Sequence, residues 1–230
     1  MAAVTFRNAE ESDADAIVDL VLNHSISENG TLQYLVGGRA EKVLRRLVAQ
    51  EGNLYGYEQT TMAERDGGVA GLFMGYSLPE MRVVAPRTFT RLMRMSSPIS
   101  WPGLIKKQAR LTRLESRPPD DSYVLGLIRA CEGDAAVISA LLAEAEVEAV
   151  EEECGALVFN APATATELIP ILEKAGFEEA SRLPIPDHWL ASQLGFDEII
   201  QYVLKTSYVP PPDEEDDEDA ADAEAAGAVD

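Results

Sequence analysis

Apolar and polar positions change period several times between residues 118 and 179, and each change predicts an element. The apolar run at 123–128 follows a Pro-Pro-Asp-Asp breaker, which favours a buried strand. From Val137 onward, apolar residues recur at three- and four-residue spacing beside many glutamates, which is typical of an amphipathic helix with a solvated acidic face. Between this strand and this helix, Gly133 permits a tight turn and Asp134 supplies a capping side chain.

The same order of elements then repeats. Residues 156–159 predict a short buried strand, and Thr164 to Glu167 match a capping box for a second helix. Pro170 removes one hydrogen bond from that helix, so its first turn is expected to be irregular or to start later. Gly176 ends the helix. Two neighbouring strands with helices laid across them predict an α/β domain with a gap where a long, thin ligand can bind.

This unit resembles the core of the GCN5-related N-acetyltransferase superfamily, and the resemblance covers nearly all of residues 3–206. The closing match runs from 172 to 179 and includes the end of the second helix and the sequence Gly-Phe-Glu. Further matches precede the unit: a first strand at 4–7, helices at 13–23 and 39–48, and a hairpin at 61–71 turned by Asp-Gly. Each match is common alone, whereas their order along one chain is much more specific.

The resemblance implies both a fold and a reaction. The fold is an α/β domain with a mixed, mostly antiparallel sheet, flanked by helices and splayed open between strands four and five. The reaction is direct transfer of an acetyl group from acetyl-CoA, the co-substrate, to a primary amine, without a metal. By the same resemblance, the residues expected to bind acetyl-CoA are Leu127, Ile128, Arg129, Gly133, Asp134, Ala135 and Ala136.

The turn at 132–136 departs from the family pattern. Relatives usually carry Arg or Gln and then glycines there, because bare backbone N–H groups must approach a diphosphate. This chain has Glu-Gly-Asp-Ala-Ala, whose two carboxylates repel such an anion, while Arg129 restores some positive charge. The alternative function is therefore a domain of the same fold that has lost catalysis and acts as an acyl-CoA sensor or in protein interaction.

The residues that would handle protons also depart from the pattern. The family's tyrosine, which protonates the departing thiolate, aligns with Leu172, and leucine cannot do that chemistry. Tyr123 or a water is then the expected proton donor. Glu64 is the candidate general base, because a desolvated carboxylate accepts protons from ammonium groups, although strand alternation leaves its face undecided. Asp120 and Asp121 are rival bases, but turn formation explains them without chemistry.

The composition is strongly acidic. The 230 residues include 40 acidic and 19 basic ones, of which five are lysine, and the net charge is −21. Such chains suit high salt, which screens self-repulsion, so we expect a halophilic, archaeal and cytoplasmic protein. The two cysteines, Cys131 and Cys154, indicate no disulfide framework, and no spacing of His, Cys and carboxylates indicates a metal site. We also expect neither a signal segment nor a membrane span.

Charge is distributed unevenly along the chain. Residues 1–208 are expected to form one acetyltransferase-like domain, and residues 209–230 an acidic, disordered tail. The stretch 81–118, called here the basic insertion, has nine basic residues against one acidic residue and is expected between strands three and four. Two amphipathic helices are predicted within it, at 86–96 and 102–116.

Three interpretations of the basic insertion are open. It neutralises the acidic body or contacts another subunit, as in a homodimer. It binds the phosphates of coenzyme A or an anionic acceptor. In the third interpretation, it lies on RNA or on an anionic membrane. Contact with RNA would make the chain an RNA-associated module, which is a third alternative for its function. The charge of the whole chain disfavours nucleic acid. The residues leave the acceptor amine open, whether small molecule or protein.

Overall fold

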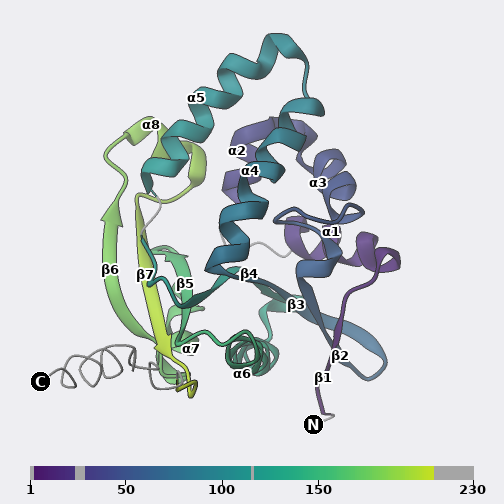
Figure 1. The fold of residues 1–230 in the computed structure, drawn as a ribbon, viewed down its shortest axis with the longest axis vertical. Coiled ribbons are helices and arrows are strands. Elements are labelled where there is room, and N and C mark those ends of the chain that lie inside the picture. Colours follow the sequence, from purple (N-terminus) through teal and green to yellow (C-terminus); the bar gives the residue numbers. More distant parts are fainter. Residues whose placement is uncertain (1–2, 24–28, 115–116, 210–230) are drawn as a thin grey trace, which may run out of the picture.

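The computed structural model describes residues 3–23, 29–114 and 117–209 (Figure 1). The fold is built on a seven-stranded sheet in which the strands follow the order β1-β2-β3-β4-β5-β7-β6. The strands are β1 (Thr5–Asn8), β2 (Thr60–Arg65), β3 (Gly68–Ser77), β4 (Ser122–Ala130), β5 (Ala156–Pro162), β6 (Glu178–Pro184) and β7 (Glu198–Lys205). All neighbouring strands are antiparallel except β4 and β5, which are parallel. The predicted mixed, mostly antiparallel sheet is confirmed.

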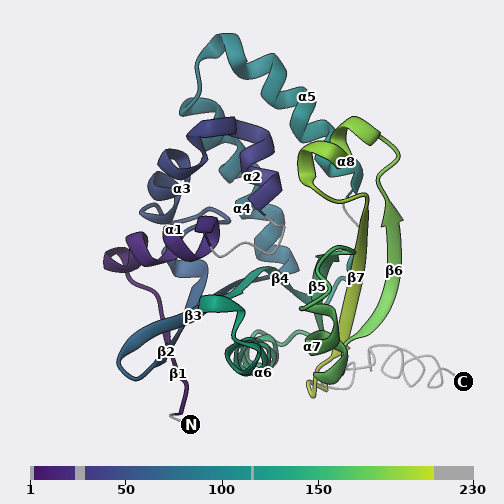
Figure 2. The same ribbon diagram turned by 180° about the vertical axis from the view of Figure 1, so that it is seen from behind.

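Helices cover both faces of the sheet. They are α1 (Ala14–Asn23), α2 (Asn29–Val36), α3 (Ala40–Val48), α4 (Leu78–Arg94), α5 (Trp101–Leu111), α6 (Ala135–Glu151), α7 (Ile169–Lys174) and α8 (His188–Leu194). Helices α1 to α5 lie above the sheet in Figure 1 and α6 lies below it, and Figure 2 shows the same arrangement from behind. The strand–helix repeat predicted from residue 123 onward is observed as β4, α6, β5 and α7.

Two apolar cores hold the sheet between these helix layers. Side chains alternate along a strand, so in β3 Leu72 and Met74 belong to the core beneath α1 and α3, while Phe73 belongs to the core beneath α6. Leu44 of α3 and Leu141 of α6 are both 0% exposed, and full burial of such a side chain contributes about 2 kcal/mol. Packing on both faces fixes the strands that frame the site described below.

The basic insertion is helical and lies between β3 and β4, as predicted. Its first helix, α4, begins at Leu78, eight residues earlier than expected, and continues through Pro86. Pro79 stands in its first turn, where a missing N–H is not needed. The second helix, α5, ends at Leu111, and a short 3₁₀ turn follows it. The end of the predicted helix at 116 and the predicted tail beyond Val209 lie outside the described residues.

Two details of the described chain complete the fold. α7 begins at Ile169, because Pro170 in its first turn suits the start of a helix better than its interior. Helix α2 was not predicted from the sequence, since its apolar residues show only a weak helical period. Among the described residues, no helix combines the length and the apolar character that crossing a bilayer requires.

Candidate active site

The strands β4 and β5 part halfway along their length. Their parallel ladder joins Ser122–Leu125 to Ala156–Phe159, and both strands continue beyond it. At the same point a bulge at Gly126 shifts the pairing of β4 with β3. A bulge bends its strand and increases the local twist, which turns the second half of β4 away from β5. The sheet is therefore splayed open where the sequence resemblance predicted, between strands four and five.

Gly126 has no side chain, which suits the point where β4 and β5 part. It is the exposed position in an otherwise buried strand. A Cβ atom at this position would lie 3.0 Å from the ring of Tyr76 on the neighbouring strand, so a larger residue would require this ring to shift. An isolated glycine within an apolar strand indicates a bulge or a close approach. The signal for the splay was therefore present in the sequence.

A cavity of about 250 Å³, called here the splay cavity, opens where the two strands part. Residues from α1, α2, β4, β5, β7 and two loops line it: Val21, Thr31, Leu32, Tyr55, Gly126, Leu127, Asn160, Pro162, Phe196 and Ile199. The polar members of this described lining, Thr31, Tyr55 and Asn160, are uncharged. Sequence reasoning did not find the contributions of α2 and of the loops, because the cavity gathers segments that lie far apart in the chain.

The turn between β4 and α6 contains the carboxylate of Asp134. Asp134 caps α6, and its Oδ1 accepts hydrogen bonds from the backbone N–H groups of Ala136 at 2.9 Å and Val137 at 3.3 Å. Its Oδ2 accepts a hydrogen bond from Arg65 at 2.7 Å. The Arg65 guanidinium, followed by the two amides, holds the pKa of the Asp134 carboxyl below its usual range. Asp134 is therefore a fixed anion at the start of the helix.

This arrangement bears on whether the turn fits the diphosphate of acetyl-CoA. The backbone is accessible, because a Cβ atom at Gly133 would have no atom within 4 Å. The preceding residue, Glu132, has a left-handed backbone with φ of 55°, which is uncommon for a residue with a side chain. The amides of Ala136 and Val137 already bind a carboxylate. The backbone of the turn is thus uncovered, but a diphosphate can bind these two amides only after Asp134 has left them.

The other residues expected to bind acetyl-CoA have different positions. Leu127 lines the splay cavity. Ile128 is 2% exposed and packs into the core beneath α6. Arg129 is 3% exposed, and its Nη1 donates a hydrogen bond to the Ile128 carbonyl at 2.8 Å. The guanidinium of Arg129 is thus held inside the fold, whereas Arg65, which sequence reasoning did not select, reaches the turn.

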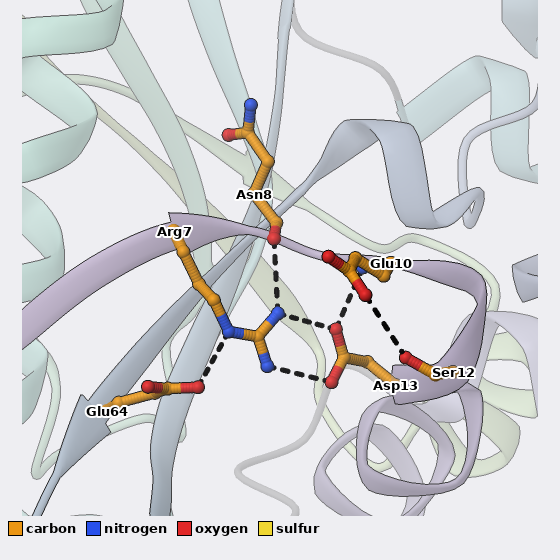
Figure 3. Close-up of polar contacts among 6 residues, drawn as sticks. All are labelled: Arg7, Asn8, Glu10, Ser12, Asp13 and Glu64. Atoms are coloured by element: carbon orange, nitrogen blue, oxygen red, sulfur yellow. Dashed lines mark hydrogen bonds and ion pairs between the residues drawn. The ribbon is translucent and has the colours of Figure 1, made fainter. Parts of the chain in front are cut away.

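Glu64, the predicted general base, lies on β2 beside β1 (Figure 3). It does not line the splay cavity. Its Oε1 accepts a hydrogen bond from Nε of Arg7 at 2.6 Å. The other nitrogens of Arg7 donate to both carboxylate oxygens of Asp13, at 2.6 and 2.8 Å, and this pairing lowers the pKa of Asp13. The structure thus gives Glu64 a cationic partner, and its role as a base stays a prediction.

Tyr123, the predicted proton donor, points to the α6 side of the sheet. Its hydroxyl donates a hydrogen bond to Oε2 of Glu148 at 2.7 Å, and Thr61 donates to the other oxygen of the same carboxylate. Burial, followed by the charge of Glu148, raises the pKa of Tyr123 well above its usual value, so the phenol stays protonated. Gly75 leaves room for the ring, which a Cβ atom there would strike at 2.3 Å.

Tyr123 lines a second cavity of about 390 Å³, called here the acidic cavity, which lies at α6. Among the residues that the structure describes, six glutamates line it: Glu58, Glu80, Glu144, Glu148, Glu151 and Glu152. Burial, followed by the charges of Glu148 and Glu151, raises the pKa of Glu144. The structure therefore separates the two predicted catalytic residues from the splay cavity and from each other. Within the described ranges, no three His, Cys, Asp or Glu side chains are arranged to hold a metal ion.

Comparison with known proteins gives a clear result for the fold. No family model matches the sequence, and no curated protein matches it. A solved structure described as an acetyltransferase is 19% identical, covers 88% of this chain and 99% of its own, and has a TM-score of 0.60. An N-acetyltransferase from Staphylococcus aureus Mu50 is 15% identical, with coverage of 87% and 100% and a TM-score of 0.61.

The ribosomal-protein-S18-alanine N-acetyltransferase from Escherichia coli is also similar, at 14% identity, with coverage of 91% and 98% and a TM-score of 0.51. The chain therefore has the fold of the N-acetyltransferases over most of its length. The fold implied by the sequence resemblance to the GCN5-related superfamily is confirmed.

Proposed function

We propose that this chain transfers an acetyl group from acetyl-CoA directly to a primary amine. The observation that carries the proposal is the parting of β4 and β5 at Gly126, with a cavity where the strands separate. Beyond the ladder, the edge of β4 offers backbone N–H and C=O groups to an extended ligand, as a sheet edge does to an added strand. The pantetheine arm of coenzyme A is extended and carries amide groups. An amine in the splay cavity would meet the thioester at the end of this arm.

The transfer needs few groups from the protein. The neutral amine nitrogen attacks the thioester carbonyl carbon, the C–N bond forms, the C–S bond breaks, and the proton lost by nitrogen ends on sulfur. Holding both reactants in one cavity supplies much of the acceleration, because a bimolecular encounter becomes an oriented local one. Tyr55 lines the splay cavity and is our candidate to protonate the departing sulfur, ahead of Tyr123. Glu64 can act as the base only when Arg7 releases it.

The turn at 133–136 is the proposed position of the donor's diphosphate. Binding there requires the carboxylate of Asp134 to rotate away from the amides of Ala136 and Val137. Arg65, which now pairs with Asp134, would then face the diphosphate and offer it charge-assisted hydrogen bonds.

Calorimetry and turnover measurements test the proposal separately. Titration with acetyl-CoA in molar potassium chloride is expected to give saturable binding at one site. Turnover with a panel of amines, including a peptide N-terminus, is expected to release free thiol and acetylated amine in equal amounts. Gly126→Ala should lower transfer, because its Cβ atom would press on the Tyr76 ring at the opening, whereas Gly103→Ala on α5, whose Cβ atom would meet nothing within 4 Å, should not. No heat with any acyl thioester would reject the proposal.

A second candidate function is supported by the turn before α6, in which Asp134 caps the helix. A domain of this fold that binds an acyl thioester weakly or conditionally, without transfer, would act as an acyl-CoA sensor or in protein interaction. Asp134 favours this candidate, because it competes with the donor for the amides of α6. Saturable binding of acetyl-CoA without release of thiol in the presence of any amine would select it over the enzyme.

A further inference from the structure

We propose that the splay cavity selects acceptor amines with an uncharged, apolar body and a single amino group, and that it rejects diamines and polyamines. The proposal rests on the acetyl transfer proposed above and names the class of its acceptor. It is carried by the lining of the cavity and by the separate location of the glutamates.

The wall of the splay cavity is mostly apolar and comes from both sides of the opening. Val21 of α1, Leu32 of α2 and Leu127 of β4 are at most 7% exposed, so the packing of the fold fixes their side chains. Phe196 and Ile199, from the segment that enters β7, complete the apolar wall. An apolar body placed here loses its contact with water and gains van der Waals contacts.

One polar group of the lining, the amide of Asn160, lies where the strands part. Asn160 directly follows the last ladder residue of β5, and Gly126 directly follows the last ladder residue of β4. These two positions mark the point where the thioester would meet the acceptor. We therefore place the reacting amino group near Gly126 and Asn160, and the body of the acceptor against Leu32 and Phe196.

A second ammonium group on the acceptor would have to enter the apolar part of the cavity. A buried charge without an opposite charge is strongly unfavourable, because it loses its hydration without compensation. The described lining residues offer only the neutral groups of Thr31, Tyr55 and Asn160. An amine whose far end is a methyl group avoids this penalty.

Among the described residues, carboxylates gather in the other cavity. Six glutamates line the acidic cavity, and one of them, Glu148, already accepts hydrogen bonds from Thr61 and Tyr123. Tyr123 of β4 lies in the core beneath α6, whereas Leu127 of the same strand lies in the core beneath α1 and α3. The sheet thus lies between these carboxylates and the splay cavity.

The size of the cavity limits the acceptor further. About 250 Å³ is available, whereas pockets for drug-sized ligands measure roughly 300 to 1,000 Å³. The acceptor body is therefore small, of the order of an alkylamine or an aralkylamine, or the apolar first residue of a peptide.

A pair of acceptors of equal length tests the proposal. Pentan-1-amine and butane-1,4-diamine have the same number of heavy atoms and differ in a terminal methyl group against a terminal ammonium. We expect kcat/KM for pentan-1-amine to exceed that for butane-1,4-diamine by at least about tenfold. Enzymes commonly discriminate to this extent between two substrates that differ in one group inside the pocket. Calorimetry of each amine with the protein, without donor, should give the same order of affinities.

A variant pair links the preference to the cavity wall. Thr31 on α2 is only partly buried, so Thr31→Glu adds a carboxylate without forcing a large apolar residue out of the core. Thr31→Glu should raise relative activity and affinity for the diamine by about tenfold, while the matched Thr31→Gln should leave the ratio near that of the unchanged chain. Circular dichroism and melting would show that both variants fold.

The outcomes separate this proposal from the proposed function. Equal or greater preference for the diamine, in transfer or in direct binding, overturns the acceptor class and leaves acetyl transfer standing. Absence of transfer with every amine, together with absence of acetyl-CoA binding, rejects the proposed function. The direct binding of the two amines still decides the selectivity of the cavity in that case.

Discussion

At the scale of single residues, the carboxylate of Asp134 controls how an anion meets the start of α6. It occupies the amides of Ala136 and Val137 and pairs with Arg65. A diphosphate needs the same amides and the same guanidinium. The two anions therefore compete, and the protein binds a donor only to the extent that its own carboxylate gives way.

We predict that Asp134→Ser binds acetyl-CoA about tenfold more tightly than the unchanged chain, because serine still caps the helix but carries no charge. Calorimetry at fixed salt measures this change. Asp187→Asn is the control, since Asp187 caps α8 through the N–H of Leu190 and its removal changes the net charge equally. Weaker binding in Asp134→Ser, or the same gain in both variants, would show that no such competition exists.

The two candidate proton donors, Tyr55 and Tyr123, are expected to behave differently when each is replaced by phenylalanine. Tyr55 lines the splay cavity, so Tyr55→Phe should lower kcat about 100-fold, as loss of a general acid does. Tyr123 bonds to Glu148 in the other cavity, so Tyr123→Phe should leave kcat within a factor of about two and lower the unfolding free energy by about 1 to 2 kcal/mol. Steady-state kinetics and urea unfolding measure the two effects. A larger kcat loss in Tyr123→Phe would restore Tyr123 as the acid.

At the scale of elements, the basic insertion braces the wall of the splay cavity. Lys107 of α5 donates hydrogen bonds to the carbonyls of Tyr34 and Leu35, at 2.5 and 3.2 Å, in the last turn of α2. Its Nζ also lies 5.2 Å from the centre of the Tyr34 ring. A cation at a helix C-terminus is favourable, because the carbonyl groups there carry partial negative charge.

Arg110, one turn further along α5, contacts the start of α8 through a ring and a carboxylate. Its guanidinium lies 5.1 Å from the centre of the Trp189 ring and 3.8 Å from the carboxylate of Asp187. The rings of Trp189 and Tyr34 meet edge to face at 6.0 Å, so the contacts of α2, α5 and α8 are continuous. Figures 1 and 2 both show the end of α5 beside α8. Among these contacts, the one between Arg110 and Asp187 joins opposite charges, and the role of the insertion stays a prediction.

We predict that Lys107→Ala raises KM for the acceptor about fivefold with little change in acetyl-CoA affinity, because a loosened α2 misplaces Thr31 and Leu32 in the cavity wall. Lys107→Arg should restore most of the loss. Lys106→Ala is the matched control, since the neighbouring Lys106 is exposed on the same helix. If both alanine variants raise KM equally, the effect comes from net charge and not from the brace.

The sequence predicted those parts of the fold that depend on local patterns. The apolar periods of β4 and α6 and the Asp-Gly hairpin between β2 and β3 were sufficient, because each is set within a few residues. The face of Glu64 was not predictable, since a bulge between Ala63 and Glu64 interrupts the alternation of β2. The pair of Arg65 and Asp134 joins residues 69 positions apart, and no local pattern reports such a contact.

The same limit applies to the candidate site. Leu127, which lines the splay cavity, was selected from the chain because the resemblance fixes its place in the fourth strand, and the turn at 133–136 stays a prediction. Tyr55 and Phe196 were not, because their approach to the splay cavity depends on how helices and loops pack over the sheet. Tyr123 was selected for its place at the start of β4, but the direction of its side chain, set by strand alternation, takes it to the acidic cavity.

At the scale of the whole molecule, the net charge of −21 is the dominant feature. Like charges repel within the compact state, and dissolved salt shortens the range of this repulsion to about 3 Å at 1 M. We predict that the melting temperature rises steeply between dilute and molar potassium chloride, as measured by calorimetry. A flat response would contradict the expected halophilic origin. Potassium glutamate in place of the chloride would test whether ionic strength, and not the chloride ion, is responsible.

The acidic cavity should supply an identifiable part of this salt dependence. Burial and the charges of Glu148 and Glu151 raise the pKa of Glu144 in the folded protein, so ionisation of this group opposes folding. The resulting loss of stability is complete at a pH above the pKa that Glu144 has in the folded protein. It weakens as the pH falls through that pKa, and it is absent below the pKa that Glu144 has in the unfolded chain. At neutral pH, Glu144→Gln removes it and is expected to raise the melting temperature in dilute buffer.

The salt dependence distinguishes the two causes of the gain in melting temperature, which are charge repulsion and burial of the Glu144 carboxylate. Molar potassium chloride screens the repulsion from Glu148 and Glu151 but does not rehydrate the partly buried carboxylate of Glu144, so the gain of Glu144→Gln should shrink without disappearing. Glu167→Gln is the matched control, because Glu167 is exposed and lies outside the acidic cavity, and its replacement changes the net charge equally. Equal shifts for the two variants at every salt concentration would mean that the stability responds to total charge alone, and that the acidic cavity has no special part in it.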